Sequence, residues 1–176
     1  MNGTSPAALA EQGKNEYEQG NFRAAADFFR QSAQAYDFAG NPANAAEMKN
    51  NQSVALLQAG KARDALQATE GTEAIFEQAH DLKRQGIAVS NRAAALEGLK
   101  RWKEALAEYE RAASILEQAG EGDMHSMVRK ASANIHLKLG HVNDTQMDIY
   151  DSLRLVEKPT FTQRMMKFLM RIGLVR

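Results

Sequence analysis

The sequence predicts an all-α protein, a solenoid of four antiparallel helix pairs followed by one C-terminal amphipathic helix. The first observation is an internal repeat: segments 20–25, 60–65, 100–105 and 140–145 align at a spacing of 40 residues without insertions. The second is that apolar residues within the units recur at intervals of three and four, the period of a helix. The third is the scarcity of helix breakers, since only three prolines occur in 176 residues.

Each unit contains two predicted helices joined by a short link. Gly20, Gly60 and Gly140 suit the left-handed residue that ends the first helix of a unit. The repeat domain spans residues 1–157 and divides into units at about 6–40, 41–80, 81–120 and 121–157. First helices are expected at 6–19, 43–59, 83–99 and 124–139. Second helices are expected at 22–39, 62–79, 102–119 and 143–156.

Residues 158–176 have a different pattern. Pro159 ends the last repeat helix, and Thr160 with Gln163 makes a capping box that begins a new one. The apolar stripe of the new helix is flanked by basic residues and consists of Phe161, Met165, Phe168, Leu169 and Ile172. We expect this basic amphipathic helix to cap the exposed edge of the fourth unit. Two alternatives are a helix lying on an anionic membrane surface and a contact surface for a partner or a second copy.

Charge is distributed unevenly along the chain, although 22 basic and 22 acidic residues cancel. Five of the bases and no acid follow Glu157, so residues 1–157 carry 17 bases against 22 acids. An acidic repeat domain lacks the basic surface that phosphate binding needs, and we expect no nucleic-acid partner. The N-terminus has no signal-peptide pattern, and no apolar run approaches the ~20 residues of a spanning helix. These observations favour a soluble, cytoplasmic protein.

Common catalytic signatures are missing: the sequence contains no glycine-rich phosphate loop, no Gly-x-Ser-x-Gly elbow and no His-Glu-x-x-His motif. The absence of cysteine excludes disulfides and thiolate metal sites. The spacing of His136 and His141 places them on different helix faces across the turn at Gly140. Asp123 and His125 lie in a predicted loop, where two residues make a weak metal signal. We therefore expect no enzyme activity, no cofactor and no metal site.

The residue types at the helix crossings resemble the tetratricopeptide repeat. That motif combines a small residue in the first helix and glycine at the turn with aromatic residues and alanine in the second helix. Unit one has this pattern at Gly13, Tyr17, Gly20, Phe22, Ala25 and Phe29. Unit three has it at Ala93, Leu96, Trp102, Ala105, Tyr109 and Ala112. The period of 40 rather than ~34 residues is similar to the long-helix variants of this family, and HEAT-like repeats are the alternative.

The resemblance implies a right-handed superhelix with a concave groove that is lined by the first helices and receives a peptide or a partner protein. By position, the groove residues are Lys14, Tyr17, Asn50, Asn51, Val54, Ser90, Asn91, Ala94, Met127, Lys130 and Asn134. Asn51 and Asn91 recur at a spacing of 40, and an amide both donates to and accepts from a peptide main chain. In the alternative interpretation, these two asparagines cap or bridge neighbouring helices.

Segment 90–95 also resembles the middle repeat of the carboxylate-clamp domains, which bind a C-terminal carboxylate. The rest of that clamp is poorly matched, because Met127 and Ala131 stand where two bases are expected. The predicted function is therefore a non-catalytic scaffold or adaptor for a protein or peptide ligand. The alternative is a peripheral membrane or self-assembly element that acts through segment 158–176, with a homo-oligomer as one outcome.

Overall fold

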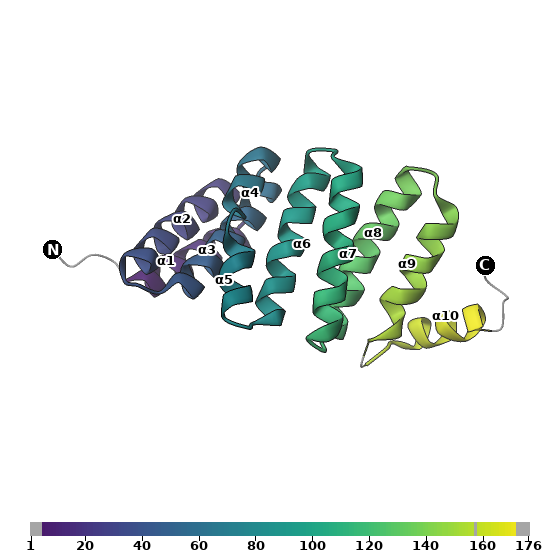
Figure 1. Ribbon diagram of the computed structural model, residues 1–176. Helices are drawn as coiled ribbons and strands as arrows, with labels where there is room; N and C mark the ends of the chain where they lie inside the picture. Colours follow the sequence, from purple (N-terminus) through teal and green to yellow (C-terminus); the bar gives the residue numbers. More distant parts are fainter. Residues whose placement is uncertain (1–4, 157, 172–176) are drawn as a thin grey trace.

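The computed structural model describes residues 5–156 and 158–171. Within these residues the chain forms ten helices: α1 (Pro6–Glu18), α2 (Phe22–Phe38), α3 (Pro42–Gln58), α4 (Ala62–Ala68), α5 (Thr72–Gln78), α6 (Leu82–Gly98), α7 (Trp102–Gln118), α8 (Gly122–Lys138), α9 (Val142–Arg154) and α10 (Phe161–Arg171). Consecutive helices from α1 to α9 pack against each other, except that α4 and α5 each pack on α3 and α6, and the pairs follow one another in an elongated array (Figure 1). This arrangement confirms the predicted all-α architecture of paired antiparallel helices.

The turns between the helices recur every 20 residues with the same backbone geometry. The left-handed position is occupied in order by Gly20, Gly40, Gly60, His80, Lys100, Gly120 and Gly140. The residue after it donates its backbone N–H to a carbonyl five residues earlier, as from Lys61 to Leu56 at 2.8 Å and from His141 to His136 at 2.9 Å. This hydrogen bond closes a Schellman turn, which ends one helix and returns the chain antiparallel to it. The repeat of 40 residues is therefore two consecutive helix–turn units of 20.

One predicted helix is wrong. The expected helix at 62–79 is broken into α4 and α5 by a turn at residues 69–71. Gly71 takes a left-handed φ of 74°. On either side of it, Thr69 Oγ1 donates to the carbonyl of Leu66 at 2.7 Å and Thr72 Oγ1 donates to that of Thr69 at 2.9 Å. Threonine hydroxyls compete with the helical hydrogen bonds in this way, and the glycine allows the chain to turn.

The core lies where the helices cross. Ala25, Ala65 and Ala105 occupy equivalent positions in units one to three, and each is fully buried. Two of the helical glycines are also close-approach residues: a Cβ on Gly13 would lie 2.8 Å from Cδ1 of Phe29, and one on Gly86 would lie 2.7 Å from Cγ of Leu116. Small residues therefore let adjacent helices approach until large side chains fill the space over the crossing.

The last helix begins as predicted. The backbone N–H of Thr160 donates to Gln163 Oε1 at 2.7 Å, and that of Gln163 donates to Thr160 Oγ1 at 3.3 Å, which closes the capping box. α10 packs against α9, and Lys167 Nζ donates to the carbonyl of Arg154 at 3.3 Å. Nearer the start of α9, Met147 is 65% exposed.

The apolar stripe of α10 is largely open to solvent. Phe161 is 81% exposed and Phe168 is 52% exposed, with Met165 between them at 47%. The side chain of Leu169 and the whole of Ile172 lie outside the described residues. Among the helices that the structure describes, none combines the length and the apolar composition needed to cross a membrane.

Candidate functional site

A cleft of about 590 Å³ opens between α1 and α3 and is called the α1–α3 cleft below. Its lining comes from three helices and comprises Ala10, Lys14, Tyr17, Glu18, Phe29, Glu47, Met48, Asn51 and Val54. Four residues of the predicted groove line this cleft together: Lys14, Tyr17, Asn51 and Val54. They are neighbours because α2 turns the chain back, so that α1 and α3 both contact it.

The lining combines an apolar floor with polar groups. Phe29 and Met48 are buried at 4% and 8% exposure, and the half-buried Tyr17 and Val54 extend the same apolar surface. Lys14, Glu18 and Glu47 bring one positive and two negative charges to the cleft. Such a surface suits an apolar side chain of a ligand at the floor and polar groups at its edge.

The amides of Asn51 and Asn91 are available. Both side chains are half-buried, and neither makes a hydrogen bond to any other residue that the structure describes. The predicted alternative, in which these amides cap or bridge neighbouring helices, therefore has no supporting contact in the described part of the chain. An unpaired amide at a partly open position retains its full capacity to donate and accept.

The other predicted groove residues are placed differently. Asn50 is buried, with 4% of its surface exposed, so it is inaccessible to a ligand in the free chain. One residue along a helix turns the side chain by about 100°, which separates Asn50 from Asn51. Ser90 Oγ donates to the carbonyl of Ile87 at 2.8 Å, and Ala94 packs against the core of unit three.

The predicted residues of unit four lie on α8, and they do not line the α1–α3 cleft. Met127 is 70% exposed, and Lys130 and Asn134 are exposed beside it. Nearby Arg129 is the base that a carboxylate clamp would need, but it is only 14% exposed and pairs with Asp148 at 3.5 Å and with Asp151 at 3.4 Å. Arg129 is therefore occupied by these two carboxylates, and Lys130 is the exposed base that remains near this position.

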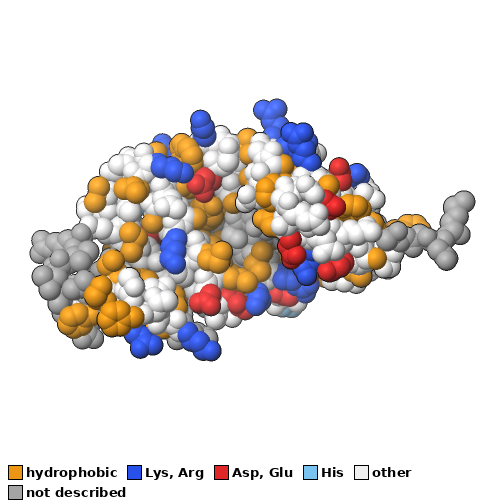
Figure 2. Space-filling view, turned by 180° about the vertical axis from the view of Figure 1, so that it is seen from behind, with side chains coloured by type: hydrophobic (Ala, Val, Ile, Leu, Met, Phe, Trp, Pro, Cys, Tyr) orange, Lys and Arg blue, Asp and Glu red, His pale blue; other side chains and the backbone are white. Residues whose placement is uncertain are grey.

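The side of the molecule opposite to that of Figure 1 is hollowed near its middle (Figure 2). Apolar side chains lie in and around the hollow, and acidic and basic side chains are scattered along its edges. This face is therefore neither uniformly acidic nor uniformly basic.

Unit four contains a buried imidazole that sequence reasoning missed. Asp123 and His125 were expected in a loop, but both belong to α8 and His125 is fully buried. Neither ring nitrogen has a hydrogen-bond partner among the described residues. Burial, reinforced by Arg129, lowers the pKa of His125 below its usual value of 6.5. The residue is therefore neutral in the folded protein at pH 7.

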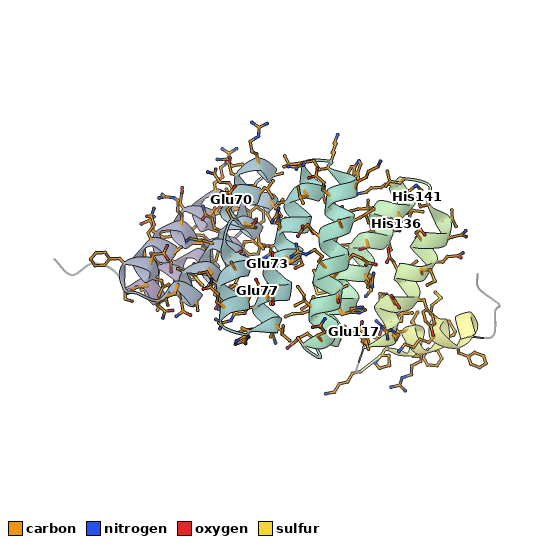
Figure 3. The ribbon with its side chains drawn as sticks, in the orientation of Figure 1. Glu70, Glu73, Glu77, Glu117, His136 and His141 are labelled. Atoms are coloured by element: carbon orange, nitrogen blue, oxygen red, sulfur yellow. The ribbon has the colours of Figure 1, made fainter. Side chains whose placement is uncertain are left out.

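The expected separation of His136 and His141 is also corrected. Their ring centroids lie 5.8 Å apart, at the end of α8 and the start of α9 (Figure 3). Helical geometry alone places residues five apart on different faces, but the Schellman turn at Gly140 folds the second ring back over the first.

No model of a protein family matches the chain, and no curated protein matches its sequence.

Proposed function

We propose that this chain is a non-catalytic protein-interaction scaffold of the tetratricopeptide type, with a right-handed superhelical stack of repeats. Its ligand is an extended segment of a partner protein, which lies across the first helices and inserts a side chain into the α1–α3 cleft. The observation that carries the proposal is the composition of that cleft: an apolar floor from Tyr17, Met48 and Val54 lies beside the unpaired amide of Asn51.

An extended segment fits this surface for a physical reason. Its apolar side chain gains roughly 25 cal/mol for each Å² removed from water. Its main chain carries unpaired N–H and C=O groups, which the amides of Asn51 and Asn91 match in both senses. Charges of both signs around the cleft, from Lys14, Glu18 and Glu47, favour a ligand of mixed rather than uniform charge.

The test is selection of a peptide library displayed on phage against the immobilised full chain, followed by calorimetry with the best peptide. Replacing both Asn51 and Asn91 by alanine removes two hydrogen bonds worth about 0.5–1.5 kcal/mol each, so the Kd should rise roughly 5- to 150-fold. Asn15→Ala is the matched control, because Asn15 is an exposed asparagine of α1 that does not line the cleft. Peptides whose affinity is the same for the double variant and the control would show that the binding surface lies elsewhere.

A second candidate function is a contact element in α10 that binds an anionic membrane surface. Its basis is the exposure of Phe161, Met165 and Phe168 next to the bases Arg164 and Lys167. Flotation with vesicles that contain anionic lipid tests it. Phe168→Asp should abolish vesicle binding, and Thr162→Asp, which adds the same charge outside the stripe, should reduce it only slightly. A full chain that does not float would contradict this function.

A further inference from the structure

Three metal-ligating side chains meet where α8 ends and α9 begins. His136, His141 and Asp144 each offer a donor atom, and these atoms all lie within 4.8 Å of one another. His136 is the third-last residue of α8, His141 is the N-cap of α9, and Asp144 follows in the first turn of α9. Nδ1 of His141 lies 3.8 Å from Oδ2 of Asp144.

The position of His136 is unusual within the repeat. At the same place the chain has the half-buried Glu16 and Tyr36 in unit one. In units two and three it has Leu56, Phe76, Leu96 and Leu116, each with less than a tenth of its surface exposed. An imidazole at this position packs less apolar surface than leucine or phenylalanine does, and it brings two ring nitrogens that need hydrogen-bond or metal partners. Unit four therefore has an imidazole where units two and three bury an apolar side chain.

The second nitrogen of His136 faces a carboxylate. Oδ2 of Asp148 lies 3.5 Å from Nδ1 of His136, and both atoms are buried without a hydrogen-bond partner among the described residues. Asp148 is held in place on its other side by Arg129, whose Nη1 is 3.5 Å from Oδ1. A carboxylate at one imidazole nitrogen is the arrangement that orients a metal-binding histidine and fixes its tautomer.

We propose that His136, His141 and Asp144 bind a zinc ion, with Asp148 as the residue that positions His136. Two imidazoles and a carboxylate are borderline and hard ligands that suit Zn²⁺, and three protein ligands leave a fourth position open. Binding would draw Nδ1–H of His136, now 3.5 Å from Oδ2 of Asp148, into a hydrogen bond with that carboxylate, and Nε2 would then hold the ion. This inference is independent of the α1–α3 cleft, which lies at the other end of the chain.

The site needs only a small adjustment to close on the ion. Donor atoms in a tetrahedral zinc site with bonds of about 2.0 Å lie roughly 3.3 Å apart. The donor atoms now lie within 4.8 Å of one another. The side chains of His141 and Asp144 are 54% and 60% exposed, so they are free to rotate until the donor atoms reach the shorter separation. His136 is 19% exposed and stays fixed by its neighbours. The ion would tie the end of α8 to the first turn of α9.

The test is calorimetric titration of the tag-free, chelator-treated full chain with Zn²⁺, repeated with Co²⁺ to observe the visible absorption of a tetrahedral site. One ion should bind per chain. Asp148→Asn should weaken binding by about 10–100-fold, because it perturbs only the orientation of a ligand. His141→Ala removes a ligand and should weaken binding further than Asp148→Asn does.

His80→Asn is the matched control, because His80 is an exposed turn histidine in a left-handed conformation that asparagine also tolerates. It should leave zinc affinity and stoichiometry unchanged. His141 is exposed, so its replacement by alanine is expected to leave the fold intact, and circular dichroism will verify this. A wild-type chain that binds no zinc, or one whose zinc affinity is unaffected by His141→Ala, would overturn the proposal.

Discussion

The hydroxyl of Tyr109 on α7 donates a hydrogen bond of 3.0 Å to Oε2 of Glu97 on α6. The other oxygen of Glu97 accepts from Nζ of Lys138 on α8 at 3.3 Å. One carboxylate therefore joins three helices and links unit three to unit four. Burial, together with the nearby charge of Glu97, raises the pKa of Tyr109, so its hydroxyl remains a donor throughout the accessible pH range.

Tyr109→Phe should lower the free energy of unfolding by about 0.5–1.5 kcal/mol, measured by urea denaturation. The ring and its packing are retained, so the loss reports the hydrogen bond to Glu97. Tyr150→Phe is the control, because Tyr150 is 45% exposed, and it should change stability by less than about 0.5 kcal/mol. Equal losses in the two variants would show that the Tyr109–Glu97 bond contributes nothing in solution.

Ala105→Leu should destabilise the protein by about 1–3 kcal/mol, because it overpacks the crossing of α6 and α7. Ala105 has no exposed surface, and it belongs to the same buried cluster as Tyr109 and Leu96. Ala107→Leu on the exposed side of the same helix is the control, with a melting temperature close to that of the wild type. An unchanged melting temperature for Ala105→Leu would show that the crossing is not packed as described.

Lys100→Gly should stabilise the protein by about 0.5–1 kcal/mol. Lys100 occupies the left-handed turn position with a φ of 61°, which costs a residue with a Cβ about 1–2 kcal/mol. The greater freedom of glycine in the unfolded chain offsets part of that gain. Thermal and urea unfolding measure the difference.

The reverse change at the equivalent turn of unit two is the matched control. Gly60 has a φ of 75°, and a Cβ there would meet nothing within 4 Å. Gly60→Lys should therefore lower stability through backbone strain alone and by a similar amount. If both substitutions have the same sign, the left-handed geometry is not what determines stability at these turns.

Stability should fall as the pH is lowered from 7 toward 5, and His125 should account for part of the fall. The pKa of His125 in the folded state lies below 6.5, so as the pH falls the unfolded chain binds a proton at this residue before the folded chain does. The free energy of unfolding then decreases with decreasing pH, by at most about 1.4 kcal/mol per pH unit for this one group. Besides burial, the charges that act on this ring are Arg129, Glu117 on α7, and Asp151 and Arg154 on α9.

The His125 contribution is isolated by comparing the pH dependence of unfolding in the wild type and in His125→Gln. The profile of the variant should be flatter between pH 7 and 5, since the other titrating groups are common to both proteins. His80→Asn removes an exposed histidine and should leave the slope unchanged. Parallel profiles for wild type and His125→Gln would mean that the buried ring titrates normally.

Most helices and turns could be predicted from the sequence, because both depend on interactions within about six residues. Apolar spacing of three and four predicted the helices apart from the break between α4 and α5, and glycine at positions such as Gly60 and Gly140 predicted the left-handed turns. Of the predicted groove residues, Lys14, Tyr17, Asn51 and Val54 line one cleft, and sequence could group them because it assigned all four to consecutive first helices.

The role of each glycine and the meeting of the two histidines depend on packing between helices. Gly86 and Gly98 lie within α6, where Leu116 and Ala62 occupy the space that a Cβ would need, whereas Gly71 takes a left-handed φ and separates α4 from α5. The sequence alone also assigned His136 and His141 to different faces. Their meeting depends on the turn that reverses the chain and on the packing of α9 against α8, and a helical period cannot represent contacts between two elements.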